Sequence, residues 1–370
     1  MFLYQIKNEA IAILGCRSYD GLVEIPETID GKPVTELAAY AFSEGWGRRE
    51  MLKAAGKILL ADAEGNAQNG MEAEMNASSP EAVELPPVAC CGHLKEIILP
   101  RTIKKIGNYA FYNCFELNTI RCYSTIEDVG SGLFTGCASI RHMDIHIIPG
   151  RRSCFKELIS ELRQELYVNY YIESELTSPP AKSALQAKLV FPEMFEESVE
   201  NTPARIIMRE MHGCGHMYRY CFEQTEFRFS KYDALFPHIK VQEPERVVCS
   251  LVMGRLKYPL ELMEPHRGAY EEYLREHMGG AAECALAAED TETYSWLAVH
   301  YADRKETLNE MIELAGREGE TEVLSGLMDL RHRRFPAKNG HFRCRHVKQE
   351  NDRKKTIKQQ NNKRKAGEAI

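Results

Sequence analysis

The stretch between residues 91 and 145 repeats itself at a fixed step of 23 residues. Laid in register, it reads CGHLKEIILPRTIKKIGNYAFYN, then CFELNTIRCYSTIEDVGSGLFTG, then CASIRHMDI. Cysteines, aliphatic residues and phenylalanines recur at this step: Cys91, Cys114 and Cys137; Leu94, Leu117 and Ile140; Ile97, Ile120 and Met143; Ile106 and Val129; Phe111 and Phe134. A step between 20 and 29 residues with this spacing of aliphatic residues is typical of a leucine-rich solenoid. We therefore expect an α/β repeat protein that begins with a short leucine-rich repeat solenoid.

Within one repeat, the segment LKEIILP predicts a short strand that the proline ends, because proline cannot donate to the strand ladder. Ile97 and Leu99 would point inward, and Ile98 would point outward. Outward positions at one repeat step would line a single sheet face. Its predicted members, which form our candidate partner-binding set, are Ile98, Arg121, Tyr123, Asp144 and His146.

The repeated phenylalanines and cysteines are interpreted as structural. Phe42, Phe111 and Phe134 are expected to stack as a continuous spine, each contributing about 1.5 to 3 kcal/mol through its burial. Cys91, Cys114 and Cys137 occupy the place where such repeats need a small side chain that bonds to turn backbone.

An earlier repeat lies upstream, because Val34, Leu37, Ala41 and Phe42 stand three repeat steps before Ile103, Ile106, Ala110 and Phe111. The pattern is lost between about residues 43 and 89, which are rich in glycine, alanine and glutamate. This stretch predicts an insertion that carries one helix near residues 49–60. Since its length matches two repeats, two degenerate repeats are the alternative.

The motif L-x-x-I-x-L-P-x-x-I-x-x-I-G-x-x-A-F-x-x-C, best matched by Leu94 to Cys114, resembles the BspA-like class of bacterial leucine-rich repeats. The resemblance covers roughly residues 1–150. Members of that class are implicated in adhesion and protein binding, usually behind a secretion signal, so the resemblance implies a protein-binding role. The third repeat departs from the pattern, because it lacks the proline and has Leu133 in place of the alanine.

The N-terminus predicts a hairpin with strands over residues 2–6 and 10–14. The alternative, a lipoprotein signal that ends at Cys16, is disfavoured because Glu9 precedes an apolar run of only five residues. Without a convincing signal peptide, we expect a cytoplasmic protein, and a secreted or surface protein is the less favoured alternative.

After residue 150 the apolar residues recur at helical spacing, so residues 151–335 are predicted to be an all-α helical-repeat domain. A capping helix is expected from Phe155 to Leu166, and the Thr202-Pro203 pair predicts a helix through Met211. Residues 308–330 resemble an ankyrin-type helix pair around Gly319, and a fainter echo over 282–297 extends this ankyrin-like region to about 280–335.

Charge is divided unevenly along the chain, whose net charge is −7. The segment from Arg331 to the end holds 14 lysines and arginines against three acidic residues. Residues 336–370 are therefore interpreted as a basic, disordered tail, or as a contact for nucleic acid or an acidic partner. No apolar run approaches the roughly 20 residues that span a bilayer, so no membrane partner is expected.

Motifs for catalysis or cofactors are weak. The sequence HGCGH, with His212, Cys214 and His216, and the nearby Cys221 are the nearest approach to a metal cluster, but no CxxC pair accompanies them and the glycines equally describe a turn. There is no phosphate-binding loop and no nucleophile motif in the sequence. The prediction is a non-enzymatic protein-interaction scaffold without a cofactor. Its alternatives are a nucleic-acid-associated or acidic-partner-binding protein that uses the basic tail, and a secreted or surface adhesin-like protein.

Overall fold

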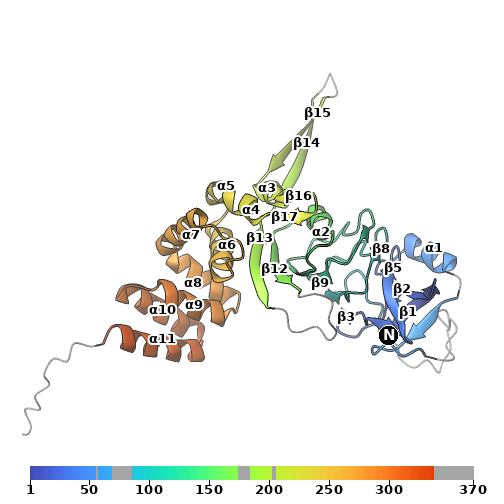
Figure 1. Cartoon of the computed structure of the whole chain (residues 1–370), viewed down its shortest axis with the longest axis horizontal. Coiled ribbons are helices and arrows are strands. Elements are labelled where there is room, and N and C mark those ends of the chain that lie inside the picture. Colours follow the sequence, from blue (N-terminus) through green and yellow to red (C-terminus); the bar gives the residue numbers. More distant parts are fainter. Residues whose placement is uncertain (56, 69–85, 174–183, 202–205, 337–370) are drawn as a thin grey trace, which may run out of the picture. The chain divides into compact units, whose positions relative to one another are not determined.

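The computed structural model describes residues 1–55, 57–68, 86–173, 184–201 and 206–336 (Figure 1). The chain divides into two compact units, Met1–Thr293 and Tyr294–Ile370. A β-solenoid of about six turns, with a period of about 24 residues, is followed by a C-terminal helical region. This confirms the predicted leucine-rich solenoid followed by a helical region.

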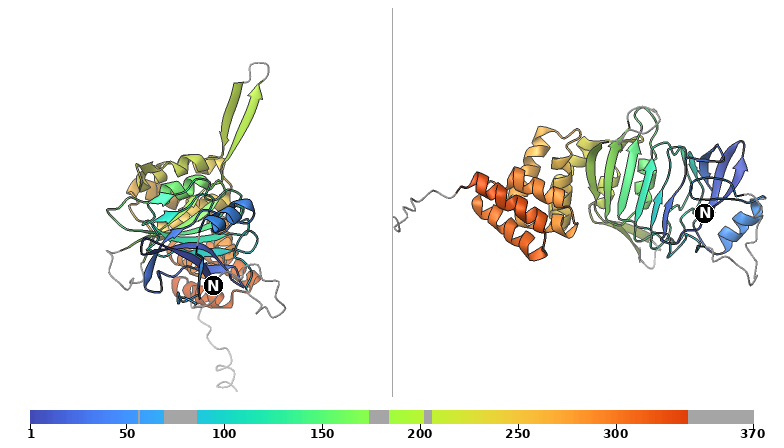
Figure 2. Two further views of the ribbon diagram at one scale, coloured as in Figure 1. Left: turned by 90° about the vertical axis from the view of Figure 1, so that its right-hand side faces the viewer. Right: turned by 90° about the horizontal axis from the view of Figure 1, so that it is seen from below.

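One side of the solenoid is a six-stranded sheet, called here the parallel sheet (Figure 2). Its strands lie in the order β3, β7, β9, β11, β12 and β13, and all are parallel to their neighbours except β13, which is antiparallel to β12. Their bounds are β3 (Leu22–Glu24), β7 (Glu96–Ile98), β9 (Thr119–Tyr123), β11 (His142–Ile147), β12 (Leu166–Ile172) and β13 (Leu185–Phe191). Val23, Ile97, Ile120, Met143 and Val168 lie opposite one another and are buried, so each strand adds one layer to the core.

The other side is a seven-stranded sheet, in which β10, β8, β5, β2, β1 and β6 follow one another and β4 pairs with β5. Its strands are β1 (Phe2–Lys7), β2 (Ala10–Cys16), β4 (Thr28–Ile29), β5 (Lys32–Leu37), β6 (Leu59–Ala61), β8 (Lys105–Ile106) and β10 (Asp128–Val129). β1 and β2 form an antiparallel hairpin whose turn residues Asn8 and Glu9 have positive φ angles. This hairpin begins the solenoid, because β2 pairs in parallel with β5.

Phenylalanine rings stack through the interior between the two sheets. The ring centroids of Phe42 and Phe111 are 5.3 Å apart, and those of Phe111 and Phe134 are 5.8 Å apart. All three side chains are buried. The turns are also close-packed, since a Cβ atom at Gly107 would lie 2.3 Å from the Ala39 backbone nitrogen.

The chain between the first and second of these phenylalanines leaves the solenoid and returns to it. β3 pairs directly with β7, and β5 pairs directly with β8, so no layer lies between them. The excursion carries helix α1 (Trp46–Ala54) and strand β6, which pairs with β1. The structure therefore supports an insertion over two degenerate repeats, and residues 69–85 of it lie outside the described residues.

The prediction of an all-α region from residue 151 is wrong between residues 166 and 227. Helix α2 (Phe155–Glu161) ends before Leu166, which begins β12. β14 (Phe195–Asn201) and β15 (Ile206–His212) form a separate hairpin that projects from the first unit (Figures 1 and 2), and the expected helix through Met211 is part of β15. β12 is a strand because its backbone pairs with the edge of β11. This tertiary pairing outweighs the local preference for a helix that the spacing of Leu162 and Leu166 indicates.

The free edge of β13 is closed by a side chain. The Tyr232 hydroxyl accepts a hydrogen bond from the Val190 backbone nitrogen at 2.8 Å and donates one to the Val190 carbonyl oxygen at 2.7 Å. Tyr232 belongs to helix α4 (Phe229–Ala234) and is fully buried. The parallel sheet therefore ends at β13 with both backbone groups of this residue satisfied.

The remaining elements are mostly helices. They are α3 (Gly215–Arg219), the short hairpin β16 (Phe222–Glu223) and β17 (Glu226–Phe227), α4 (Phe229–Ala234), α5 (Phe236–Gln242), α6 (Glu245–Lys257), α7 (Glu264–Glu276), α8 (Met278–Ala287), α9 (Thr291–Tyr301), α10 (Lys305–Glu318) and α11 (Thr321–Arg334). Gly319 has a φ angle of 80° and ends α10 in the left-handed conformation that glycine favours. Among the described residues, no helix combines the length and apolarity needed to cross a bilayer.

Candidate functional site

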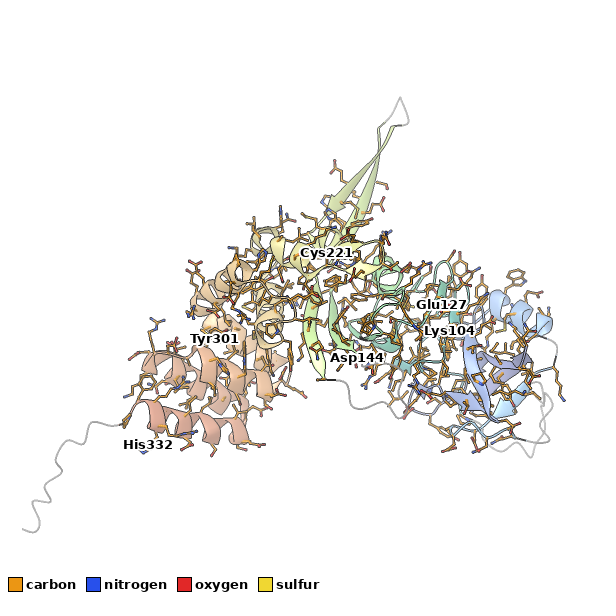
Figure 3. All side chains as sticks on the ribbon, viewed as in Figure 1. Lys104, Glu127, Asp144, Cys221, Tyr301 and His332 are labelled. Atoms are coloured by element: carbon orange, nitrogen blue, oxygen red, sulfur yellow. The ribbon has the colours of Figure 1, made fainter. Side chains whose placement is uncertain are left out.

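The outward positions of the parallel sheet form a continuous row across its strands. Ile98, Arg121 and Asp144 lie opposite one another on β7, β9 and β11, and the row continues to Asn169 on β12 and Lys188 on β13. The register exists because each strand is one solenoid layer. Asp144 is marked on this sheet in Figure 3.

Charged side chains on and beside this row hold one another in place. The Nε atom of Arg121 lies 3.0 Å from Glu96 Oε1 and 3.5 Å from Asp144 Oδ2. The Asn169 Nδ2 atom donates a hydrogen bond of 2.8 Å to Asp144 Oδ1. Arg121 remains about half-exposed, so it stays available to a partner while its direction is fixed.

Two strand positions further, three rings form what we call the aromatic ladder: Tyr123, His146 and Tyr171. The His146 ring lies 4.7 Å from Tyr123 and 4.5 Å from Tyr171, measured between centroids, and both contacts are stacked. His146 Nδ1 lies 2.6 Å from Glu173 Oε1. Burial raises the pKa of both tyrosines, so their hydroxyls are neutral hydrogen-bonding groups at the surface of the ladder.

Sequence reasoning found Tyr123 and His146 but missed Tyr171 and Glu173. The 23-residue register fades after residue 145, and the segment that holds Tyr171 was expected to lie in a helical domain. The signal that could have found Tyr171 is the alternation in LYVNYYI, where buried Leu166, Val168 and Tyr170 alternate with partly exposed residues.

A cavity of about 840 Å³ lies next to this face, between strands β12 and β13 and helices α6 and α8. Its lining includes Tyr167, Lys188, Arg246, Met253 and Tyr258. Arg246 makes a two-bond contact with Glu165, of 2.7 and 2.8 Å, and Lys188 Nζ lies 3.1 Å from Asp290 Oδ2. Arg246 and Lys188, two charged residues of the cavity lining, are therefore already paired within the chain.

The repeat cysteines bond to the layer before them. The Sγ atom of Cys114 donates to the Phe42 carbonyl oxygen at 3.0 Å, and that of Cys137 donates to the Phe111 carbonyl oxygen at 3.0 Å. Burial raises the pKa of Cys137 to about 12, so this thiol is protonated. Cys91 differs, because it is only partly buried and has a φ angle of 47°.

The HGCGH residues and Cys221 have separate partners. Cys214 Sγ donates to Glu243 Oε1 at 3.2 Å, His216 Nδ1 lies 3.0 Å from the Gly213 carbonyl oxygen, and Cys221 Sγ donates to the Met217 carbonyl oxygen at 3.5 Å. Cys221 is marked in Figure 3. Across the described ranges, two groups of three residues bring possible ligand atoms within 4.8 Å of one another, and only His212, with Glu197 and Glu210, comes from this candidate set. The other group is Glu44, Cys90 and Cys91.

The basic tail, residues 336–370, lies outside the described residues except for Pro336. The last described helix, α11, already carries basic residues in its final turn: Arg331, His332, Arg333 and Arg334.

Comparison with known proteins agrees with this fold. A family model for the BspA type leucine rich repeat region (6 copies) matches residues 88–166. No curated protein and no solved structure matches the chain. Residues 88–166 are thus BspA-type leucine-rich repeats, a repeat class that generally serves as a protein-interaction scaffold and is typically non-catalytic.

Proposed function

We propose that this chain is a non-enzymatic interaction scaffold that binds a protein partner through the aromatic ladder and the neighbouring Arg121. The observation that carries the proposal is the unbroken stack of Tyr123, His146 and Tyr171 on the outward face of the parallel sheet. Tyrosine and arginine are enriched among the residues that dominate binding energy in protein interfaces.

The rigidity of this face supports the proposal. The rings are held on neighbouring strands by backbone pairing, and His146 is held further by Glu173. A partner that binds pre-ordered side chains loses less conformational entropy than one that must order them. The ladder therefore offers contact area at a small entropic penalty.

The charges near the ladder favour a protein over a nucleic acid. Glu96, Asp144 and Glu173 lie beside Arg121 and the ladder, and Glu27 and Arg101 both interact electrostatically with Tyr123. A phosphate backbone would be repelled by these carboxylates, because its binding depends on excess lysine and arginine. A protein surface with mixed charge and an apolar centre fits this arrangement.

The test uses a partner captured by the parent protein and then purified. Its affinity is measured by calorimetry for a triple variant, Tyr123→Ala, His146→Ala and Tyr171→Ala. The matched control is Lys105→Ala with Asp128→Ala, an exposed pair on the opposite sheet whose charged atoms lie 3.4 Å apart. We expect the triple variant to bind the partner at least about 30-fold more weakly, which corresponds to the loss of one side chain that contributes about 2 kcal/mol to the binding free energy. Unchanged affinity of a folded triple variant would refute the assignment of this face.

The helical region is proposed as a second contact surface. Helices α10 and α11 form a pair around Gly319, and the Tyr294 hydroxyl donates to the Met311 carbonyl oxygen at 2.6 Å within the same unit. The ankyrin-like character of this pair belongs to the proposal. Partner binding by a chain ending at residue 303 tests whether α10 and α11 contribute.

The basic composition of residues 336–370 favours a second candidate function, contact with a nucleic acid or an acidic partner. Filter binding of RNA and DNA by the full chain and by a chain ending at residue 336 separates the candidates. Tail-dependent affinity that falls steeply with salt would support this second function, and absence of binding would remove it. An adhesin-like role is tested by locating the protein in fractionated native cells.

A further inference from the structure

The insertion meets the solenoid at a group of sulfur and oxygen atoms that the interaction face does not use. The thiol sulfurs of Cys90 and Cys91 and a carboxylate oxygen of Glu44 all lie within 4.8 Å of one another. Glu44 stands where the chain leaves the solenoid and the two cysteines stand where it returns, so 46 residues separate Glu44 from Cys90. Cys90 is buried, Cys91 is partly buried and Glu44 is exposed.

We propose that Glu44, Cys90 and Cys91 form a binding site for a thiophilic divalent cation, with Zn²⁺ as the best fit. Two thiolates and one carboxylate are ordinary zinc ligands, and a fourth position would be taken by water. Zn–S bonds of about 2.3 Å in a tetrahedral site place two sulfurs about 3.8 Å apart. The two sulfurs would therefore need to approach by no more than about 1 Å, a change within the reach of side-chain rotation.

The charge of the surroundings suits this site. Two thiolates and a carboxylate carry three negative charges, of which the cation neutralises two. The Arg48 guanidinium, which interacts electrostatically with all three ligands, supplies the remaining positive charge. Arg48 is 8% exposed and donates to the Leu14 carbonyl oxygen at 3.3 Å and to the Ala41 carbonyl oxygen, so it is fixed beside the site.

Without a cation, the thiols are protonated. Cys90 Sγ donates a hydrogen bond of 3.2 Å to Glu44 Oε1. Zinc binding therefore releases both protons, because the metal takes thiolates as ligands.

The site would pin the neck of the insertion against the solenoid. The unfolded chain does not hold residues 44, 90 and 91 together, so the free energy of zinc binding adds to the stability of the folded state. Zinc would thus raise the thermal stability of the first unit without touching the aromatic ladder, so this inference is independent of the proposed function.

The test begins with the full chain, purified under reducing conditions, dialysed against Zn²⁺ and then against metal-free buffer. We compare the parent, Cys90→Ser, Cys91→Ser and Glu44→Gln, with Cys284→Ser as a control thiol that is partly buried elsewhere. Elemental analysis should find about one zinc per parent chain and per Cys284→Ser chain. Either serine variant at residue 90 or 91 should lose most of it, and Glu44→Gln should bind zinc roughly tenfold more weakly.

Two further readouts separate a bound metal from a folding defect. Calorimetry in buffers of different ionisation enthalpy should show release of about two protons per zinc in the parent. Cd²⁺ should give a thiolate-to-metal absorbance band that Cys91→Ser loses while its circular dichroism matches the parent. Zinc retained in both folded serine variants, or no zinc in the parent, would overturn the proposal.

Discussion

Phe42 and Phe111 stack with their ring centroids 5.3 Å apart and their planes 17° from parallel, although 69 residues separate them in the chain. This separation equals three repeat steps, yet the two rings belong to neighbouring layers. The layers join because β3 and β5 pair directly with β7 and β8. The spine is therefore continuous across the insertion.

Phe111→Ala should lower the free energy of unfolding by about 3 to 5 kcal/mol, because it removes a ring that touches both neighbours in the spine. Urea unfolding followed by circular dichroism measures the change. Phe115→Ala is the control, since Phe115 is 51% exposed and its loss should cost less than about 1 kcal/mol. Equal losses in the two variants would contradict the spine.

Gly107→Ala should destabilise the solenoid by about 1 to 3 kcal/mol, because the new methyl group would meet the Ala39 backbone at 2.3 Å. Gly268→Ala is the matched control: this glycine lies inside α7 and its Cβ would have no neighbour within 4 Å. The control should gain about 0.5 to 1 kcal/mol from helix propensity. If both substitutions changed the free energy of unfolding in the same direction relative to the parent, the layers would not pack as described.

A buried ion pair joins α4 and α6. Asp233 accepts hydrogen bonds from Arg255 Nε and Nη2, both of 2.8 Å, and from the Tyr270 hydroxyl at 2.9 Å, and the side chains of Asp233 and Arg255 are fully buried. Arg255→Met should lower the unfolding free energy by about 3 to 5 kcal/mol, because it leaves a buried carboxylate without its cation. Adding Asp233→Leu should restore much of the lost stability. A double variant less stable than Arg255→Met alone would argue against the unpaired carboxylate as the cause.

Ionisation of Glu165 should make the free energy of unfolding depend on pH. Burial alone would raise the pKa of Glu165, but hydrogen bonds from Arg246 and Tyr167 outweigh burial and hold it below its ordinary value of 4.5. A carboxyl group whose pKa is lower in the folded than in the unfolded state stabilises the fold at pH values above its unfolded-state pKa. This stabilisation is lost as the pH falls through the lowered pKa of the folded state.

Glu165→Gln should therefore cost about 1 kcal/mol at pH 7, a value limited by the exposure of Arg246, and less below pH 4.5. Urea unfolding at pH 7 and at about pH 3.5 measures both differences. A difference between parent and variant that stays constant with pH would contradict the role of ionised Glu165.

The repeat register was predictable because solenoid layers are copies: the residues at equal steps meet in space. Phe111 and Phe134, or Arg121 and Asp144, are therefore neighbours that counting along the sequence reveals. The insertion could be recognised by the loss of pattern. Its direct bridging by β3 and β7 needed the structure, because residue counting allowed two further layers.

The strands after residue 165 could not be predicted by the same means. β12 pairs with β11, and β13 pairs with β12 in the opposite direction, so both owe their conformation to a partner that local spacing does not show. Leu162 and Leu166 stand at helical spacing, yet the helix ends at Glu161. The group of Glu44, Cys90 and Cys91 was missed for a related reason, since Cys90 falls outside the 23-residue register and Glu44 lies far from it in sequence.

The Tyr232 hydroxyl satisfies both backbone groups of Val190, so the two edges of the parallel sheet differ in how readily they could accept another strand. At the β13 end an incoming strand would have to displace a buried side chain. At the other end, the three-residue strand β3 is the last in the sheet, and its Leu22 is 53% exposed. Within the described part of the chain, strand addition to this sheet is therefore favoured at β3 over β13.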